Sequence, residues 1–288
     1  MEPAAMTDKV VVITGGARGM GRAYVHAFLA AGAKVVATDR SWDGAETPPA
    51  ELSDNGRKLL ACDMDVTNDT QIDKAYEAAL ARFGTIDVLI NNAALRQRDL
   101  FPPTGRVTTL ETKDSDWERS FAVNVFGVLK VTRRFIRPML EKKRGSVVNT
   151  VSSGILNHSH GGAYTALRPN SREMPYMSSK AALATMSFYL ADEVKDRGVA
   201  VNIVVPGHTR TTGFDEQNRA RLAQGARPGP LPVVPEHMVP LVLYLAGQDA
   251  STMTGRMFDV MIWNEEHGFG GHERWADRSF SYESLLPR

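Results

Sequence analysis

The stretch KVVVITGGARGMG, residues 9–21, decides the fold class of this chain. Its first six residues form an apolar, β-branched run that ends in glycines, typical of a strand buried in a parallel sheet. An Ala-rich helical pattern follows over residues 22–31, and Gly32 supplies a stop signal. Glycines between a buried strand and a helix let the backbone approach a pyrophosphate at the positive helix end. A plain tight turn is the alternative, but this position in the chain favours dinucleotide binding.

The rest of the chain alternates short β-branched runs with longer helical patterns. Further strands are predicted at residues 34–38, 58–64, 86–90, 146–151, 199–205 and 256–262. Helices are predicted at residues 69–83, 116–140, 175–194 and 235–246. This alternation predicts an α/β, Rossmann-type, doubly wound parallel sheet of about seven strands with helices on both faces. Without a linker or an internal repeat, residues 1–288 are expected to form one dinucleotide-binding and catalytic domain.

Three long stretches, residues 95–113, 154–174 and 212–232, fit no regular element. All three follow the carboxyl ends of predicted strands, where open α/β sheets bind ligands. We therefore expect them to wall a pocket, with residues 212–232 as a substrate lid. The tail, residues 263–288, is rich in aromatic residues, and we expect it to cover a neighbouring subunit or to close a pocket.

Composition narrows the class of protein. The formal charge is +1, from 34 basic and 33 acidic residues, with no long run of one sign. This argues against a nucleic-acid partner or an anionic membrane surface. The lone cysteine, Cys62, fits a reducing compartment. No segment resembles a signal peptide or a membrane span, so the expected location is cytoplasmic.

The end of the second predicted strand bears on the choice of cofactor. Asp39 stands 18 residues after Gly21, where a carboxylate can accept hydrogen bonds from the adenosine ribose. The same charge would repel the extra phosphate of NADP. Arg18 and Arg40 could instead pair with that phosphate. We weigh the carboxylate more heavily and predict NAD, with NADP as the less favoured cofactor.

The reactive chemistry is expected on the helix at residues 175–194. Tyr176 and Lys180 lie four residues apart, hence on one helix face. A nearby cation favours the phenolate and lowers the phenol pKa, so Tyr176 can act as an acid and a base. A surface Tyr–Lys pair is the alternative. Two serines, Ser152 and Ser153, follow the fifth strand, and Asn124 lies in an apolar helix, where it either bridges backbone groups or holds a water.

In these marks the sequence resembles the short-chain dehydrogenase/reductase family, in its simple one-domain oxidoreductase branch, from about residue 9 to residue 260. The matching motifs are Thr14-Gly-x-x-x-Gly19-x-Gly21, Asp65-Val66, Asn91-Asn92-Ala93-Ala94, Asn124, Ser153, Tyr176-x-x-x-Lys180 and Pro206-Gly207-x-x-x-Thr211. Two departures stand out. Ser153 and Tyr176 are 23 residues apart, about ten more than the family commonly shows, and the last strand lacks the usual Asp-Gly-Gly ending.

The resemblance implies roles for these residues. Tyr176 would exchange the proton, Lys180 would lower its pKa and bind the nicotinamide ribose, Ser153 would bind the substrate oxygen, and Asn124 would anchor a water. Ser152 stays open as the alternative serine. The residues expected to bind the cofactor are Gly15, Arg18, Gly19, Met20, Gly21, Asp39, Arg40, Asp65, Val66, Asn92, Ala93, Tyr176, Lys180, Pro206, Gly207, Thr209 and Thr211.

The predicted reaction is the interconversion of a small secondary alcohol and its ketone by hydride transfer. A reductase of imines or activated alkenes and a non-catalytic dinucleotide-binding scaffold are the alternatives. The resemblance also implies a homodimer or homotetramer. A basic rim favours a carboxylate-bearing or polyphenolic substrate, unless its charges are merely solvated; it comprises Arg96, Arg98, His158, His160, Arg168 and Arg172. His267 and His272 lack a third ligand at diagnostic spacing, so no metal is predicted.

Overall fold

The parallel sheet is assembled around β1 (Val10–Thr14), which pairs with β2 (Lys34–Asp39) on one side and β4 (Val88–Asn91) on the other. The structure is a computed structural model and describes residues 6–43, 57–155 and 173–286. The other strands are β3 (Leu59–Asp63), β5 (Gly145–Thr150), β6 (Val199–Val205) and β7 (Met257–Asp259). Their order is β3-β2-β1-β4-β5-β6-β7, and every pair is parallel. The predicted fold class is therefore confirmed. The strand order reverses between β1 and β4, the point at which open parallel sheets bind ligands.

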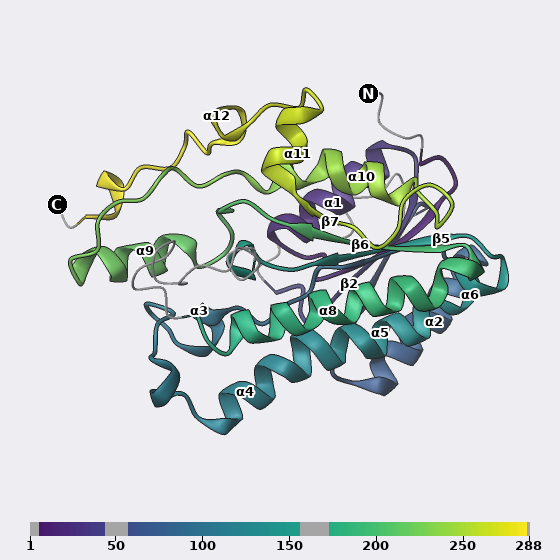
Figure 1. Ribbon diagram of the computed structural model, residues 1–288, viewed down its shortest axis with the longest axis horizontal. Helices are drawn as coiled ribbons and strands as arrows, with labels where there is room; N and C mark the ends of the chain where they lie inside the picture. The colour runs from purple at the N-terminus through teal and green to yellow at the C-terminus, as the bar shows by residue number, and fades with distance from the viewer. Residues whose placement is uncertain (1–5, 44–56, 156–172, 287–288) are drawn as a thin grey trace.

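Side chains that alternate along β1 supply two separate hydrophobic cores. Val11 and Ile13 pack on one face of the sheet, and Val10 and Val12 pack on the other. The first face is covered by α1 (Gly19–Ala30), α10 (Val239–Ala246) and α11 (Val260–Glu266). The second is covered by α2 (Asp69–Phe83), α5 (Val128–Phe135) and α8 (Tyr176–Val194), as Figure 1 shows. Burial on both sides explains why these strands read as continuous apolar runs.

The helix predicted over residues 116–140 is broken into four pieces. These are α4 (Asp114–Phe121), a π-helical turn η3 (Ala122–Gly127), α5, and α6 (Arg137–Glu141). Pro138 lacks a backbone amide hydrogen and stands at the start of α6. The wide turn of η3 contains Asn124, which is fully buried. A π-helical turn often marks a functional position, and this one faces the site described below.

The prediction of a strand over residues 256–262 is wrong for the second half of that range. β7 ends at Asp259, and α11 starts directly after it. The Asp259 carboxylate accepts hydrogen bonds from the backbone amides of Met261, at 2.9 Å, and Ile262, at 3.3 Å. Such an N-cap stabilises a helix at the point where the apolar pattern alone suggests a longer strand.

The segments expected to be irregular contain short helices. Residues 95–113 hold α3 (Gln97–Leu100), and residues 212–232 hold α9 (Phe214–Ala223), a helix that the sequence analysis did not predict. Most of the 154–174 insertion lies outside the described residues. None of the helices in the part of the chain that the structure describes has the length and apolar character needed to cross a membrane.

A candidate dinucleotide cleft and substrate pocket

The turn after β1 needs glycine at several positions. Gly15 and Gly19 have φ angles of +69° and +52°, in the left-handed region that favours glycine. A Cβ atom on Gly21 would lie 1.9 Å from the carbonyl oxygen of Gly15. The tight bend therefore brings the N-terminus of α1 to the end of β1, and the predicted glycine turn is present.

The glycine turn is held to the end of β4 by Thr14 and Asn92. The Thr14 hydroxyl accepts hydrogen bonds from the backbone amides of Asn92 and Ala93, both at 3.0 Å. The Asn92 side-chain amide donates to the carbonyl oxygens of Thr14, at 3.1 Å, and Gly15, at 3.2 Å. These bonds make the two neighbouring strand ends one rigid unit at the floor of the cleft.

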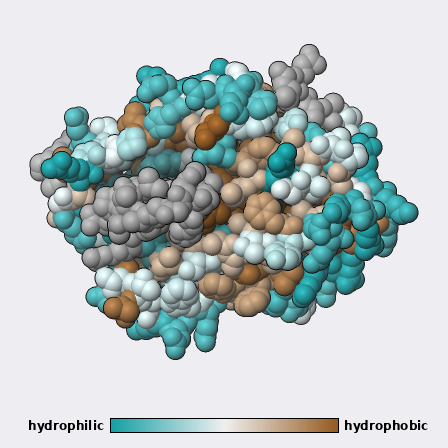
Figure 2. Space-filling model, viewed as in Figure 1, coloured by the Kyte–Doolittle hydropathy of each residue, from teal (hydrophilic) through white to brown (hydrophobic). Residues whose placement is uncertain are grey.

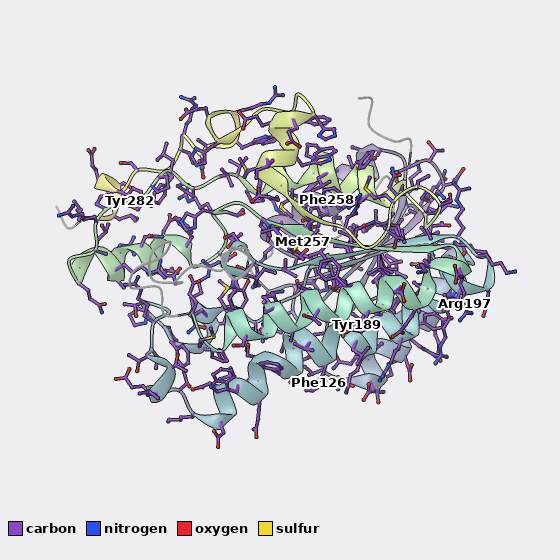
Figure 3. The ribbon with its side chains drawn as sticks, viewed as in Figure 1. Phe126, Tyr189, Arg197, Met257, Phe258 and Tyr282 are labelled. Carbon is purple, nitrogen blue, oxygen red and sulfur yellow. The ribbon has the colours of Figure 1, made fainter. Side chains whose placement is uncertain are left out.

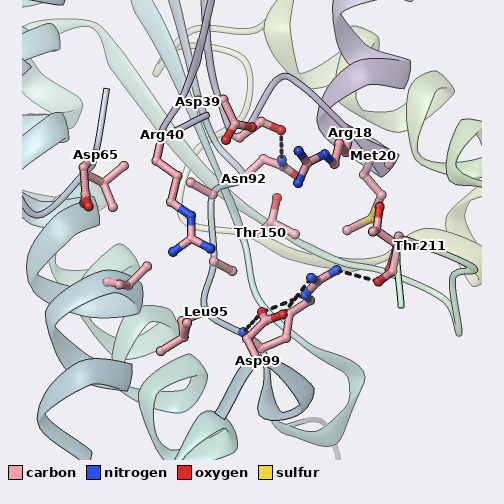
Figure 4. A pocket seen from close by; sticks show the side chains of 18 of the residues that line it. Arg18, Met20, Asp39, Arg40, Asp65, Asn92, Leu95, Asp99, Thr150 and Thr211 are labelled. Carbon is pink, nitrogen blue, oxygen red and sulfur yellow. Dashed lines mark hydrogen bonds and ion pairs between the residues drawn. The ribbon is translucent and has the colours of Figure 1, made fainter. Parts of the chain in front are cut away.

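A cavity of about 270 Å³, which we call the cofactor cleft, opens at these strand ends (Figure 4). Most of the predicted cofactor residues line it: Gly15, Arg18, Gly19, Met20, Asp39, Arg40, Asp65, Val66, Asn92, Ala93, Tyr176, Lys180 and Thr211. Four predicted residues do not. Gly21 is buried under the turn, and Pro206, Gly207 and Thr209 line a second cavity.

Asp39, Arg18 and Arg40 lie together at one end of the cofactor cleft (Figure 4). The Asp39 carboxylate accepts hydrogen bonds from the backbone amides of Ala17, at 3.1 Å, and Ser41, at 3.5 Å. Backbone donors thus fix its position, and the two guanidinium groups face the same space. One carboxylate and two cations meet where the sequence predicts the adenosine ribose.

Lys180 is 2% exposed and points back to the end of β5. Its ammonium nitrogen donates a hydrogen bond of 2.8 Å to the carbonyl oxygen of Thr150 and lies 5.9 Å from the centre of the Tyr176 ring. Burial lowers the pKa of Lys180 to about 7, because a low-dielectric interior disfavours the charged form. The lysine is thus placed to give or take a proton near neutrality, one helical turn from the phenol.

Tyr176 stands where α8 begins, with the charges of several loops around it. Burial and the Glu173 carboxylate raise its pKa to about 12, while a hydrogen bond with Ser152 and the charges of Arg96 and Arg98 act in the opposite direction. The expected depression of the phenol pKa is therefore not present in this structure. Here burial outweighs the nearby cations.

Ser152 and Ser153 both line the second cavity, but it is the Ser152 hydroxyl whose hydrogen bond with Tyr176 lowers the phenol pKa. The family resemblance favours Ser153 for the substrate oxygen, with Ser152 as the alternative. Spacing along a loop could not distinguish two adjacent hydroxyls, whose directions depend on how the loop leaves β5.

The Asn124 amide bridges two elements of the site. Its oxygen accepts from the Leu95 backbone amide at 2.8 Å, and its nitrogen donates to the Leu95 carbonyl at 2.9 Å and the Ser179 hydroxyl at 3.0 Å. Of the two predicted alternatives, the structure shows the backbone bridge. Both amide hydrogens are used, so the side chain ties the cleft wall to α8 beside Tyr176.

The second cavity, which we call the substrate pocket, has a volume of about 200 Å³. Its wall combines polar groups with the apolar side chains of Met177 and Phe214. It shares four residues with the cofactor cleft: Met20, Arg96, Tyr176 and Thr211. Tyr176 therefore stands at the junction between the cleft that contains the glycine turn and the smaller pocket.

Comparison with known proteins agrees with this arrangement. Residues 9–222 match the family described as short chain dehydrogenase. The chain belongs to this family. A fluoren-9-ol dehydrogenase from Terrabacter sp. is 51% identical over 272 residues, which cover 94% of this chain and 76% of that protein. A 3-oxoacyl-(acyl-carrier-protein) reductase from Escherichia coli is 30% identical over 259 residues, which cover 88% of this chain and 95% of that protein.

A solved structure also resembles this short-chain dehydrogenase. The crystal structure of a 3-ketoacyl-(acyl-carrier-protein) reductase from Brucella melitensis complexed with NADH superposes with a TM-score of 0.70 at 26% identity. It covers 88% of this chain and 97% of that one. These comparisons establish an oxidoreductase of the short-chain dehydrogenase family.

Among the described residues, no group of three histidine, cysteine, aspartate or glutamate side chains is arranged to hold a metal ion. The two tail histidines bond to backbone oxygens, His267 to Trp263 at 2.8 Å and His272 to Leu231 at 2.9 Å.

His237 supports the pocket wall, and the sequence analysis did not single it out. It is fully buried, its Nε2 atom accepts from the Gly207 backbone amide at 3.0 Å, and its Nδ1 atom lies 2.7 Å from the Val234 carbonyl. This pairing requires the neutral tautomer with the proton on Nδ1. Burial lowers the pKa of His237 to about 4. In the sequence, His237 stands in an apolar helical pattern, and such a pattern does not reveal the hydrogen-bond partners of the imidazole.

His237 should make folding stability fall in mild acid. Because its pKa is lower in the folded protein than in the unfolded chain, its contribution is complete above about pH 6.5 and is lost as the pH falls toward 4. The expected loss is about 3 kcal/mol. Urea unfolding of wild type and His237→Gln at several pH values measures it. The difference in stability between the two should shrink as pH falls; a constant difference would contradict the assignment.

Proposed function

We propose that this short-chain dehydrogenase interconverts a secondary alcohol and its ketone with NAD(H), using Tyr176 as acid and base. The observation that carries this proposal is the placement of Tyr176. Its phenol lies at the junction of the two cavities, hydrogen-bonded to Ser152, with the buried Lys180 one helical turn away. A proton donor between a hydride carrier and a carbonyl is what such a reaction requires.

The residues of the cofactor cleft fit a nicotinamide dinucleotide. A Cβ atom on Gly15 would lie 3.0 Å from Ala93, and one on Gly19 would lie 3.1 Å from Thr211, so side chains there would narrow the cleft. Gly19 and Met20, the first residues of α1, line the cleft, and the free backbone amides of a helix N-terminus suit a pyrophosphate. Met20 and Thr211, shared with the substrate pocket, would flank the nicotinamide. The bound cofactor would accept or donate the hydride.

The protein supplies the proton chemistry. In the oxidising direction, the positive charge of bound oxidised nicotinamide would favour the Tyr176 phenolate. The carbinol O–H breaks and its proton passes to that phenolate, while the C–H bond breaks as hydride and the C=O bond forms. Ser152 donates a hydrogen bond to the substrate oxygen. Lys180, with a pKa of about 7, favours the phenolate when its own amine is protonated. Asn124 acts as a positioning residue because its amide joins Leu95 to α8.

The substrate is proposed to be an aryl-substituted secondary alcohol. The fluoren-9-ol dehydrogenase relative indicates a flat, apolar body next to the carbinol. Met177 and Phe214 give the pocket apolar surfaces of that kind, and Met20 adds a flexible thioether at the border with the cleft. Fluoren-9-ol is accordingly the first compound to test.

NAD is proposed as the cofactor on the basis of Asp39. Its carboxylate, fixed by the amides of Ala17 and Ser41, lies where it accepts hydrogen bonds from ribose hydroxyls and repels an added phosphate. The NADH in the Brucella melitensis reductase agrees with this preference. Arg18 and Arg40 line the same end and would limit how strongly NADP is rejected.

Replacement of Tyr176 by Phe should lower kcat/KM with fluoren-9-ol by a factor of about 100 or more. Ser152→Ala should also cost about 100-fold, because one donor to the developing oxyanion is lost, whereas Ser153→Ala should stay within about threefold. Absorbance of reduced nicotinamide measures turnover, and cofactor titration should show nearly unchanged binding in Tyr176→Phe. If Ser153→Ala were inactive and Ser152→Ala active, the substrate oxygen would be bound by Ser153 and not by Ser152.

Replacement of Asp39 by Ala should reverse the cofactor preference. We expect affinity for NAD to fall about tenfold, because two charge-assisted hydrogen bonds are lost, and affinity for NADP to rise. The additional variant Arg40→Ala should lose that gain if Arg40 pairs with the phosphate. Titration of both cofactors into the three proteins measures these affinities. Unchanged preference in Asp39→Ala would contradict the NAD proposal.

We also propose that the chain forms a homodimer or homotetramer through the outer face of α8 and the neighbouring helices. Phe126 is 56% exposed, Phe188 40% and Tyr189 70%. Figure 3 places Phe126 and Tyr189 on this side of the molecule, and Figure 2 shows apolar residues gathered over the same helices. Exposed aromatic residues that lie close together are typical of subunit interfaces.

Sedimentation should therefore detect an oligomer that Tyr189→Glu weakens. A buried charge at the centre of an apolar interface is costly, so the dimer dissociation constant should rise at least tenfold. Leu110→Glu, at a position 98% exposed on another part of the surface, is the matched control and should leave the oligomer intact. A wild-type protein that sediments as a monomer at all concentrations would exclude this interface.

A further inference from the structure

Three guanidinium groups enter the substrate pocket from two sides. Arg96 and Arg98 come from the segment of α3, and Arg221 comes from α9. Arg96 is neutralised by Asp99 in a two-pronged ion pair, with N–O distances of 2.8 and 2.9 Å. The other two are not paired in this way.

Arg98 and Arg221 are both partly buried, and each has an Nε atom that is shielded from solvent without a hydrogen-bond partner among the described residues. Arg98 donates to the Thr211 hydroxyl, a neutral partner. Burial and the charge of Arg96 lower the pKa of Arg98 to about 10, and burial together with Arg106 lowers the pKa of Arg221. Each cation therefore lies in surroundings that disfavour its charge.

The chain provides little negative charge to balance them. Glu173 is the one carboxylate among the described residues that line the substrate pocket, and its charge acts on both Tyr176 and Arg221. Residues 156–172 contain neither aspartate nor glutamate, but they contain two histidines and two arginines. The neighbouring insertion therefore cannot supply the missing carboxylate.

The cofactor is an unsuitable source of the missing anion. Arg98 and Arg221 line the substrate pocket and not the cofactor cleft, whereas the turn that suits a pyrophosphate lies in the cofactor cleft. Of the three arginines, only Arg96 borders both cavities, and it already has its partner in Asp99.

We propose that the substrate carries a carboxylate, bound between Arg98 and Arg221, while its carbinol or ketone carbon faces Tyr176 and Ser152. The inference rests on the proposed function and names its substrate class: an aromatic secondary alcohol or ketone with an acidic substituent. Guanidinium groups bind carboxylates through paired N–H donors, and desolvation in a pocket strengthens such bonds. The carboxylate takes no part in the chemistry and returns unchanged with the product.

The test compares fluorenones that carry a carboxylic acid at different ring positions with their methyl esters. Each pair shares its ring and its ketone, and the ester differs from the acid by the loss of the charge and the addition of one methyl group. Reduction is followed by loss of NADH absorbance, and binding to the NADH-loaded enzyme is measured by calorimetry. For at least one ring position we expect the acid to exceed its ester about tenfold or more in affinity and in kcat/KM.

Arg221→Met should lower this acid-over-ester ratio about tenfold or more, because it removes the fork and keeps most of the side-chain volume. Arg219→Met, in the same helix but exposed, is the matched control and should keep the ratio of the wild type. Arg221→Lys, which retains the charge without the fork, should give an intermediate ratio and serves if the Met variant does not fold.

Acids that bind no better than their esters at any ring position would overturn the carboxylate site. An unchanged ratio in Arg221→Met and Arg221→Lys would overturn the role of Arg221. If esters and fluorenone are reduced without preference for acids, the proposed reaction stands and the carboxylate site fails. If nothing is reduced but acids bind more tightly than esters, the carboxylate site stands and the proposed reaction fails.

Discussion

The hydrogen bond from the buried amine of Lys180 to the carbonyl of Thr150 is the contact on which the reactive geometry depends. An amine that is 2% exposed loses most of its hydration, and a carbonyl at the end of β5 compensates part of that loss. The bond ties the first turns of α8 to the strand end that carries Ser152. Tyr176, one turn before Lys180, is thereby held against the Ser152 hydroxyl.

A second set of contacts joins the loop after β6, α9 and the C-terminal tail. Arg210 pairs with Asp215 at the start of α9, at 2.6 and 2.9 Å, and with Asp277 of the tail at 3.0 Å. Phe214 of α9 packs with Phe280 and Leu285 of the tail. The tail therefore packs against α9 of its own chain, within the segment that the sequence predicts as a substrate lid. Arg210 therefore joins the loop after β6, the start of α9 and the tail at one point.

Charge is distributed unevenly along the combined cavity. At one end, a carboxylate held by backbone amides faces two guanidinium groups. At the junction, a lysine and a tyrosine are buried together. At the far end, cations outnumber carboxylates. A ligand that spans this path would meet in succession the Asp39 carboxylate, the Tyr176 phenol and an excess of positive charge.

The interior of the sheet contains a polar contact that no strand pattern suggests. Asn91 of β4 donates to Asn149 of β5 at 2.8 Å and to Thr132 of α5 at 3.0 Å, and Asn149 donates to Ser187 of α8 at 2.8 Å. All four side chains are buried. The chain of bonds fixes α5 and α8 against the central strands, because a shift of either helix would leave buried amides unpaired.

The sequence by itself determined the sheet, the glycine turn and the Tyr176–Lys180 spacing, because strand and helix periodicities and left-handed turns depend on neighbours close along the chain. Tertiary structure decided what local patterns do not contain. It oriented Ser152 toward the phenol, capped α11 through Asp259 and widened the helix around Asn124. It also folded α9 within residues 212–232 and raised the pKa of Tyr176 by burial. Each of these depends on groups that meet only when distant segments pack, and on the solvent that packing removes.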